Sequence, residues 1–469
     1  MNYDYDLIVL GAGSGGLPVI RGANQLGLKV AMIEKAKIGG DCLNTGCVPS
    51  KTFLKSAKVL HMMRNADRYG VPPYPVKTDF SMIMQRLRKV QGKIEEHENP
   101  EYFENLGVKV CIGPPAFEDK HRVRINGELL SAKKFVISTG SRAFVPPIEG
   151  ADKTELLTNE EIFSLDSLPE SLIVLGGGPI GVEMAQAFRR FGSEVTVIEM
   201  EPHILPREDP ELARELQRLL EEEGIRIHTG SKVVQVGQDG QGKFAVLEKE
   251  GRKSRLRGSD ILVSVGRRPN IEGLELENAG VKYTKRGITV SRRMQTSTSN
   301  IFAVGDVVGP YYFSHTAGYQ AGVAFSNLFF RLPIRADLSV VPWVTFTDPE
   351  LARAGLTEDE AKQQGIRYEV ARFSFDNLDR TITESETEGF SKILISRGKI
   401  IGIHLLGSHA GESFHTLYLA MKNKIPVSKV SRLIYVYPTH SEIINRTLGQ
   451  YFFKRIYSKW SKKIVRWIY

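Results

Sequence analysis

Residues 7–16 read LIVLGAGSGG, an apolar strand that runs directly into a glycine-rich turn. Residues 172–181 read LIVLGGGPIG and repeat this plan. In both, the glycines follow the spacing G-x-G-x-x-G, and a second strand ending in an acid comes next, VAMIEK at 30–35 and VTVIEM at 195–200. The first glycine permits a tight turn, the second lets the backbone approach a pyrophosphate, and the third lets the helix pack on the strand. Two such units predict an α/β protein with two dinucleotide sites.

The glycines and the terminal acid of each unit are the expected contacts. A helix N-terminus binds phosphate, and an acid at the end of the second strand accepts ribose hydroxyls. One such motif alone can be a turn without a ligand, but two complete copies make that alternative weak. The expected residues are Gly11, Gly13, Gly16 and Glu34 in the first unit, and Gly176, Gly178, Gly181 and Glu199 in the second.

Length and composition set limits on the class of protein. At 469 residues, with 41% apolar and 25% charged residues, we expect a globular protein of two to four domains. There is no run of about 18 apolar residues, which argues against a transmembrane helix. Residues 1–10 enter a strand pattern without a signal-peptide pattern, so we expect a cytoplasmic, unprocessed chain.

The net charge of +9 is concentrated in the tail. Six basic residues and no acid lie between Tyr451 and Tyr469. The body of the chain is therefore nearly balanced, and we do not expect nucleic acid as a partner.

Two of the three cysteines stand close together in GGDCLNTGCVPSK at residues 39–51. A helix is expected from about 48 to 63, so Cys47 lies at a helix N-terminus, where the dipole favours a thiolate, and Lys51 lies on the same face. This pattern predicts a redox-active pair of Cys42 and Cys47. Zinc is the competing interpretation, but no second Cys/His pair stands at ligand spacing, so we expect no metal. Cys111, alone in an apolar strand, is expected to be a buried small side chain.

With these motifs the chain resembles the class I pyridine nucleotide-disulfide oxidoreductases, the family of dihydrolipoamide dehydrogenase, glutathione reductase and mercuric reductase. Four further segments carry the resemblance over essentially the whole chain. They are VISTGSR (136–142), LVSVGRRPN (262–270), IFAVGDVVG (301–309) and PWVTFTDPELARAGLTE (342–358).

The resemblance implies which cofactor each unit binds. FAD would bind the first unit and NAD the second, Cys47 would lie against the flavin, Cys42 would exchange with substrate, and Lys51 would pair with Glu183. The implied FAD contacts are Gly11, Gly13, Ser14, Gly16, Glu34, Lys35, Lys51, Ala116, Thr139, Gly140, Gly305, Asp306 and Ala317. The implied NAD contacts are Gly176, Gly178, Gly181, Glu183, Glu199, Val233 and Gly266. Because Glu199 would repel a 2′-phosphate and is followed by MEPH, we expect NADH rather than NADPH.

The C-terminal motif departs from the family pattern His-Pro-Thr-x-Ser-Glu. Here residues 437–442 read YPTHSE, so Tyr437 holds the histidine position and Glu442 is retained. An unperturbed phenol, with a pKa of about 10, is a poor base near pH 7. His440 would substitute if the helix began at Pro438. A tyrosine at this position is similar to the pattern of the mercuric reductases. However, no cysteine follows Cys111 to capture a metal ion.

The last segment, 449–469, predicts one basic amphipathic helix. At 100° per residue, Phe452, Phe453, Ile456, Tyr457, Trp460, Ile464, Trp467 and Ile468 share an arc of about 160°, and the basic side chains other than Lys463 lie opposite it. Such a helix binds an anionic membrane surface, or it docks on the dimer. The two alternatives stay open.

The resulting architecture is two Rossmann-type dinucleotide-binding domains plus a C-terminal α+β dimerisation domain. We expect a discontinuous FAD domain at 1–152 and 272–341, an NAD domain at 153–271 and an interface domain at 342–448. Family likeness implies a homodimer in which residues 437–442 complete the disulfide site of the other subunit. The leading hypothesis is a dihydrolipoamide dehydrogenase-like enzyme acting on a small dithiol/disulfide or lipoyl protein. The alternatives are a metal-ion or quinone reductase, and a membrane-docked electron-transfer flavoprotein.

Overall fold

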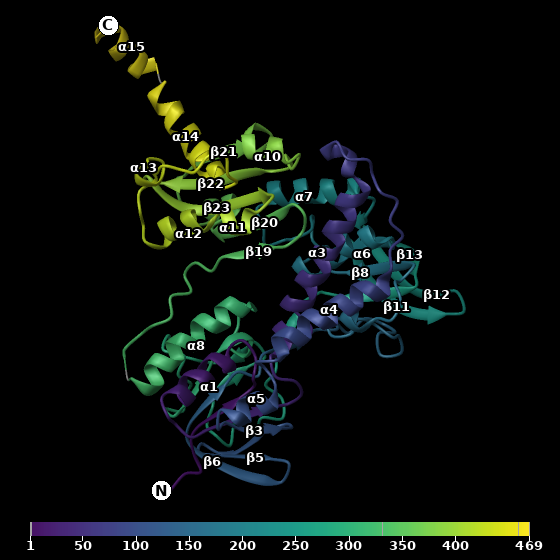
Figure 1. Cartoon of the computed structure of the whole chain (residues 1–469), viewed down its shortest axis with the longest axis vertical. Helices are drawn as coiled ribbons and strands as arrows, with labels where there is room; N and C mark the ends of the chain where they lie inside the picture. The colour runs from purple at the N-terminus through teal and green to yellow at the C-terminus, as the bar shows by residue number, and fades with distance from the viewer. Residues whose placement is uncertain (1, 331, 458, 469) are drawn as a thin grey trace.

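The computed structural model describes residues 2–330, 332–457 and 459–468; of these, the side chains of residues 454, 455 and 459 are not described. The chain forms a mixed α/β fold with three units. In Figure 1 the N-terminal unit lies at one end, the second unit lies to one side, and the C-terminal unit lies at the other end with the chain terminus projecting from it.

The first unit is built on a seven-stranded sheet. Its order is β3-β2-β1-β6-β5-β4, and β18 also pairs with β6. β1, β2, β3, β6 and β18 run parallel, whereas β4 and β5 are antiparallel. The strands are β1 (Tyr5–Leu10), β2 (Val30–Glu34), β3 (Lys109–Ile112), β4 (Ala116–Asp119), β5 (Arg122–Ile125), β6 (Glu128–Ile137) and β18 (Ile301–Ala303). The chain therefore leaves this sheet and returns to it after the second unit.

Helices position the ends of these strands. α1 (Gly16–Gln25) begins directly after the first glycine turn, and α8 (Ser314–Phe329) packs beside it in the same apolar core as β1 and β2. Between β2 and β3 lie α2 (Gly40–Asn44), α3 (Cys47–Arg64), the 3₁₀ turn η1 (Ala66–Tyr69), α4 (Phe80–Glu95) and α5 (Pro100–Asn105). α3 begins at Cys47, as expected from the sequence.

The second unit repeats the parallel plan on a smaller scale. Its sheet has the order β10-β9-β8-β14, and an antiparallel meander β11-β12-β13 lies beside it. The strands are β8 (Ser171–Leu175), β9 (Glu194–Ile198), β10 (Arg226–His228), β11 (Lys232–Asp239), β12 (Gly242–Lys249), β13 (Arg252–Gly258) and β14 (Asp260–Val263). The helices α6 (Pro179–Phe191) and α7 (Pro210–Glu222) each carry proline in the first turn, where its missing N–H leaves no bond unmade.

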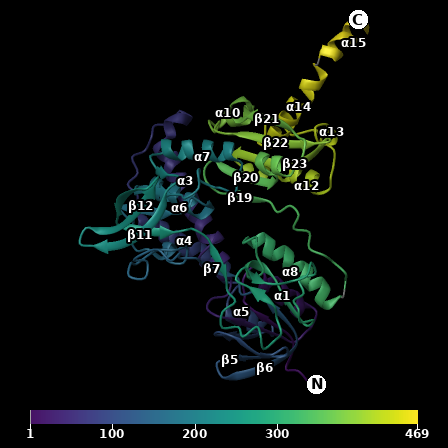
Figure 2. The same cartoon turned by 180° about the vertical axis from the view of Figure 1, so that it is seen from behind.

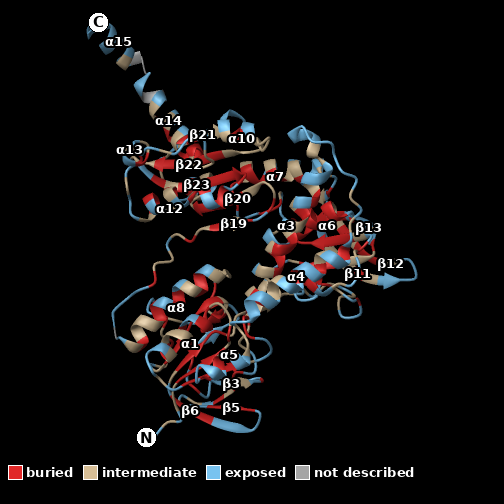
Figure 3. Cartoon of the chain, in the orientation of Figure 1, coloured by how far each residue is buried: buried red, intermediate tan, exposed pale blue. Residues whose placement is uncertain are grey.

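α3 and α4 belong to the largest apolar core together with the second unit. The Phe53 ring of α3 meets Phe188 and Phe191 of α6 at centroid distances of 5.1 and 4.7 Å, and all three are fully buried. Figure 3 shows this buried region where α3 and α6 lie side by side. The helix that begins at Cys47 is therefore fixed by apolar packing against the second unit.

Short elements connect the units. β7 (Ser141–Ala143) pairs with β15 (Arg267–Pro269), and β16 (Tyr283–Thr284) pairs with β17 (Gly287–Ile288). Single 3₁₀ turns occur at η2 (Ile162–Ser164) and η3 (Gly305–Val307). The β7–β15 pair joins the end of the first unit to the end of the second.

The third unit is an antiparallel sheet covered by short helices. Its order is β19-β20-β23-β22-β21. The strands are β19 (Trp343–Thr345), β20 (Glu350–Gly355), β21 (Glu369–Ser374), β22 (Phe390–Ser396) and β23 (Lys399–Gly407). The helices are α9 (Glu358–Gln363), η4 (Phe375–Asn377), α10 (Asp379–Thr383), α11 (Ala410–Ser413), α12 (His415–Lys422) and α13 (Val427–Val430).

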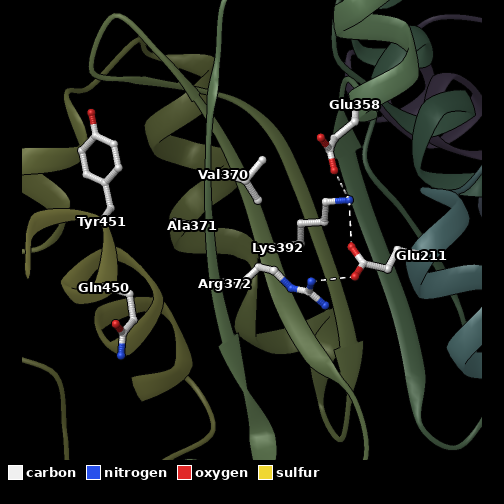
Figure 4. Close-up of a pocket in the computed structure, with 8 residues that line it drawn as sticks. All are labelled: Glu211, Glu358, Val370, Ala371, Arg372, Lys392, Gln450 and Tyr451. Carbon is white, nitrogen blue, oxygen red and sulfur yellow. Dashed lines mark ion pairs between the residues drawn. The ribbon is translucent and has the colours of Figure 1, made fainter. Parts of the chain in front are cut away.

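A buried lysine ties the third unit to the second. The Lys392 ammonium on β22 lies 3.0 Å from Asp209, 3.1 Å from Glu211 and 2.5 Å from Glu358. Asp209 is the N-cap of α7 and accepts the backbone N–H of Glu211. Figure 4 shows this lysine between its carboxylates on one side of a cavity of about 410 Å³. The lysine therefore neutralises carboxylates from both units.

The C-terminal segment differs from the expected single helix over 449–469. Its described residues form α14 (Glu442–Ile456) and α15 (Lys459–Ile468), and residue 458 between them lies outside the described residues. Ile443, Leu448 and Tyr451 of α14 are buried in the core of the third unit, and Phe452 packs against it. α14 thus begins earlier than expected because its first turns complete this core. In the described residues no helix is long and apolar enough to cross a membrane.

Candidate functional site

The first glycine turn is shaped by close backbone contacts. Gly11 has φ +98°, and a Cβ there would lie 2.4 Å from the Ser138 carbonyl oxygen. A Cβ on Gly16 would lie 2.0 Å from the Gly11 carbonyl oxygen, because α1 packs tightly on the turn. At Gly13 the nearest atom would be 3.6 Å away, so the backbone there is open to a ligand. These are the three glycine roles that a pyrophosphate-binding turn requires.

The second glycine turn has the same geometry. Gly176 has φ +102°, and a Cβ on Gly181 would lie 2.0 Å from the Gly176 carbonyl oxygen. The middle residue, Gly178, is again open, with the nearest atom at 4.0 Å. The repeat seen in the sequence is therefore a repeat of structure.

An acid lies at the mouth of each turn. Glu34 accepts the backbone N–H of Ala12 at 2.8 Å, and Glu199 accepts that of Gly177 at 2.8 Å. A carboxylate oxygen that accepts one hydrogen bond keeps a second lone pair for a ribose hydroxyl. The open middle glycines and these fixed acids fit one dinucleotide at each turn. Lys35, beside Glu34, is exposed.

A third group of expected residues lies where the chain re-enters the first sheet. Ser141 donates to the Asp306 carboxylate at 2.6 Å, and burial raises the pKa of Asp306. Thr139 donates to the Asn270 carbonyl at 2.7 Å, and the Gly305 N–H donates to Gln320 at 2.7 Å. The other expected positions are Ala116 in β4, Gly140 after β6, Val233 in β11, Gly266 before β15 and Ala317 in the first turn of α8.

Cys42 lies in α2, and Cys47 is the first residue of α3; both are free thiols. Hydrogen bonding between the two thiols shifts both of their pKa values, and the Cys47 sulfur lies 3.4 Å from the Ser314 hydroxyl at the start of α8. The Ser14 hydroxyl of the first glycine turn also lowers the pKa of Cys42. The sulfur pair therefore lies between the first glycine turn and the start of α8.

The two thiols lose their first proton as a pair, so the expected Cys47 thiolate stays a prediction. The hydrogen bond from the Cys47 thiol lowers the pKa of Cys42 to about 6, with the Ser314 and Ser14 hydroxyls acting in the same direction. The hydrogen bond to Cys42 and burial raise the pKa of Cys47. Only one sulfur of a contacting pair ionises readily, and the Lys51 cation that was expected to favour Cys47 is held by a carboxylate.

That carboxylate is Glu183, as the resemblance implied. The Lys51 ammonium donates to Glu183 at 2.8 Å, and the Glu183 side chain is only 6% exposed. The other Glu183 oxygen accepts the backbone N–H of Phe346 at 2.8 Å, and the Phe346 ring lies 4.3 Å from the Lys51 nitrogen. Residues of three units therefore meet beneath the first turn of α3.

The C-terminal residues contact their own unit instead of the cysteines. Tyr437 donates to Asp379 at 2.8 Å, and this hydrogen bond raises the pKa of Tyr437. His440 lies 2.8 Å from Glu384, and burial lowers the pKa of His440. Helix α14 begins at Glu442 and not at Pro438, so His440 lies in the turn before the helix.

Glu442 does not orient Tyr437. It accepts from Arg446, one turn along α14, at 2.9 Å. Its second oxygen is buried and has no hydrogen-bond partner among the described residues. Among those residues, no group of three or more His, Cys, Asp or Glu side chains is placed to hold a metal ion.

Sequence reasoning missed three residues in contact with the expected set. Ser314 reaches Cys47, Phe346 holds Glu183, and Arg267 forms a short ion pair with Asp41, next to Cys42. For Ser314, the local sequence gives a weak signal, because a serine shortly after IFAVGDVVG is typical of the start of a helix. Nothing in the local sequence indicates the other two, because their partners lie more than 150 residues away in the chain.

Two family models match the chain. Residues 5–322 match the pyridine nucleotide-disulphide oxidoreductases, and residues 341–448 match the dimerisation domain of the same family.

Curated relatives bear two names. A dihydrolipoyl dehydrogenase of Bacillus subtilis is 35% identical, covering 95% of this chain and 97% of its own. A mercuric reductase of Bacillus cereus is 33% identical, covering 94% of this chain and 70% of its own. Among solved structures, the Cu(II) complex of the HOCl-induced flavoprotein disulfide reductase RclA from Escherichia coli has a TM-score of 0.84 at 28% identity, covering 94% of this chain and 99% of that one.

Proposed function

The chain belongs to the pyridine nucleotide-disulphide oxidoreductase family, and from this premise we propose that it moves electrons between NADH and a small dithiol or disulfide of the lipoyl type. The family implies FAD and a nicotinamide dinucleotide as cofactors. The observation that carries the proposal is the interacting pair of Cys42 and Cys47, with Lys51, one turn along α3 from Cys47, in an ion pair with the buried carboxylate of Glu183. Related dihydrolipoyl dehydrogenases along the whole chain support the substrate class.

We assign one dinucleotide to each unit. Residues 1–152 and 272–341 would hold FAD, 153–271 would hold NAD, and 342–448 would form the dimer interface. FAD would lie on the Gly11–Gly16 turn, with Glu34 against its ribose. Asp306 and the start of α8 would contact the rest of the cofactor. When bound, FAD supplies the chemistry that accepts hydride from NADH and passes two electrons to a disulfide.

The protein's own residues handle the sulfur and proton steps. Reduction of a Cys42–Cys47 disulfide breaks one S–S bond and takes up two electrons and two protons. Oxidation of a substrate dithiol to its disulfide supplies the same two electrons and two protons. Cys42, with the lowered pKa, is the sulfur suited to attack or leave. Glu183 holds the Lys51 charge, which acts on Cys47, in one place, so that charge need not reorganise during the reaction.

We infer a preference for NADH from Glu199. This acid is held in place by the Gly177 N–H at 2.8 Å and would repel a 2′-phosphate, and the next residue, Met200, is exposed and uncharged. The kcat/KM for NADH should exceed that for NADPH. The double variant Glu199→Ala/Met200→Arg should reverse the ratio, while Glu201→Ala, an exposed acid on the same loop, should leave it unchanged. A wild-type protein that prefers NADPH contradicts this proposal.

A metal-ion reductase is the second candidate, and Tyr437 favours it. Its hydroxyl is held by Asp379, and its raised pKa makes it a poor base for a thiol. Several relatives are named mercuric reductases, and the solved RclA structure is a Cu(II) complex. In this candidate, electrons follow the same path to the sulfur pair and leave to a soft metal ion.

One titration separates the two candidates. The FAD-loaded protein is titrated anaerobically with dihydrolipoamide, and in parallel with NADH, while long-wavelength thiolate-to-flavin absorbance is recorded. The proposal expects this band with both reductants. A band with NADH alone removes the dithiol proposal and leaves the metal-ion candidate.

A variant at Tyr437 adds a kinetic readout. Tyr437→His should raise kcat for dihydrolipoamide by about tenfold or more, because imidazole accepts a proton near neutral pH. Tyr437→Phe is the matched control, since it removes the hydroxyl without supplying a base. If Tyr437→His leaves dithiol turnover unchanged and abolishes metal-ion reduction, the second candidate is the correct one.

A further inference from the structure

Helix α15 presents an apolar face and a basic face, and its apolar side chains are exposed. We propose that α15 docks the protein on the surface of an anionic lipid bilayer. This inference rests on the tail alone and is independent of the substrate proposed above.

The side chains of the apolar face are exposed in the described part of the chain. Trp467 is 87% exposed and Trp460 78%, and the other members are also exposed. At 100° per residue they share an arc of about 160°. The members are Trp460, Ile464, Val465, Trp467 and Ile468. Tryptophan is enriched where a membrane meets water, because its ring is apolar and its N–H is polar.

The opposite face is basic. Lys462, Lys463 and Arg466 occupy an arc of about 100°, and all three are exposed. Lys463 and Lys462 lie at the two edges of the apolar face, where a long side chain keeps its charge in the headgroup layer while its stem lies on the apolar surface. No acid occurs from 451 to 469, so the charge of the tail complements an anionic surface and no charge of the tail opposes it.

The position of α15 leaves both faces accessible. In Figures 1 and 2 it lies at the free end of the chain and extends away from the three units, and Figure 3 shows it as largely exposed. The preceding helix, α14, is held in the third unit by buried Leu448 and Tyr451. α15 therefore projects from a fixed base.

Two alternatives to a lipid surface are weaker. The match to the family's dimerisation domain ends at residue 448, so α15 lies outside the residues that match this domain. At 10 residues, α15 is about 15 Å long, half of the roughly 30 Å hydrocarbon core, so it would lie in the interface and not span the membrane.

The test is sedimentation of the FAD-loaded, full-length protein with vesicles. Vesicles of phosphatidylcholine with about one third phosphatidylglycerol are compared with pure phosphatidylcholine, at low and high salt. We expect recovery with the anionic vesicles to exceed recovery with neutral ones by about tenfold, and high salt to reverse much of it. A chain ending at Tyr457, which keeps α14 and the buried Tyr451, should lose the binding and keep NADH-dependent ferricyanide reduction.

Point variants show whether vesicle binding depends on the two faces of α15 or only on the net charge of the protein. Trp460→Ser/Trp467→Ser, which keeps every charge, should lose most of the binding, as should Lys462→Glu/Lys463→Glu. Arg252→Glu/Lys253→Glu makes the same charge change on exposed β13 and should bind as the wild type does. The proposal is overturned if the full chain does not bind anionic vesicles, if the shortened chain binds equally, or if the shortened chain instead dissociates into monomers without any lipid effect.

Discussion

Cys42 and Cys47 form a hydrogen bond, so the dithiol releases its first proton at a lower pH than an isolated thiol does. Hydrogen bonding with Cys47 is the main cause that lowers the pKa of Cys42 to about 6. The same contact makes a second ionisation unfavourable, since it would place two negative charges side by side. One sulfur of the pair is thus a nucleophile at neutral pH, and the other keeps its proton.

The pH dependence of alkylation tests the lowered pKa of Cys42. In the reduced protein, iodoacetamide should modify Cys42 at a rate that is full above about pH 7 and half-maximal near pH 6, because thiolate is lost as pH falls through its pKa. Cys47→Ala removes the hydrogen-bond donor, so the midpoint should rise toward the ordinary thiol value of about 8.5. Peptide mass spectrometry reports the site, and Cys111→Ala is the control. Equal midpoints for wild type and Cys47→Ala would refute the proposed cause.

Among single residues, the sequence predicts the role of those that belong to a short motif. Gly11, Gly13 and Gly16 could be predicted because their spacing reflects one turn, and the Lys51–Glu183 pair followed only from the family resemblance. The way in which the two sulfurs share a charge could not be predicted. It depends on Ser14 of the glycine turn and Ser314 of α8, and on Glu183 holding the lysine charge.

At the scale of elements, a buried carboxylate lies between the loop before α7 and strands β19 and β20. Glu208 is 3% exposed, accepts the Trp343 indole N–H and has a second oxygen with no partner among the described residues. The Trp343 ring lies between the guanidinium groups of Arg207 and Arg353, at 4.9 and 4.8 Å. Burial raises the pKa of Glu208 to about 7, and the nearby arginine charges only partly offset this.

The raised pKa makes stability depend on pH. The folded chain keeps the Glu208 proton up to about pH 7, whereas the unfolded chain releases it near pH 4.5, so the stability that this group contributes falls as pH rises through that window. Glu208→Gln cannot ionise, so it should be more stable than wild type at pH 8, by up to about 3 kcal/mol, and close to it at pH 5.

Thermal melting at both pH values checks this prediction. Glu201→Gln, an exposed acid on the same loop, is the control and should change little at either pH. A Glu208→Gln difference from wild type that is the same at pH 5 and pH 8 would show that Glu208 does not titrate in this range.

Element boundaries were predictable where caps and periodicity agree. α3 begins at Cys47 as expected, since glycine precedes it and proline stands in its first turn. The tail was expected to be one helix because its apolar residues keep helical spacing from Phe452 to Ile468. Periodicity does not report where a helix is anchored: the core of the third unit takes Tyr451 and Phe452, and a separate helix, α15, follows.

At the scale of the whole molecule, the C-terminal residues and the sulfur pair lie in different units. Tyr437 and His440 contact Asp379 and Glu384, at and beside α10, and no described contact joins them to Cys42 or Cys47. The third unit matches a dimerisation domain. We therefore infer that a second copy of the chain brings residues 437–442 to the sulfur pair, and this arrangement was expected from the sequence only through the family resemblance.

Subunit mixing tests the shared site. Homodimers of Cys42→Ser lack the sulfur, and homodimers of Tyr437→Ala/His440→Ala lack both side chains of the C-terminal motif, so each should have little disulfide turnover while retaining NADH-dependent ferricyanide reduction. A mixed dimer has one site with every wild-type residue, because the intact sulfur pair of one chain meets the intact motif of the other. After random association, half of the dimers are mixed and each has one intact site, so turnover should recover to about one quarter of wild type. Sites contained within single chains predict no recovery, and full turnover by the Tyr437→Ala/His440→Ala homodimer would show that the C-terminal motif takes no part.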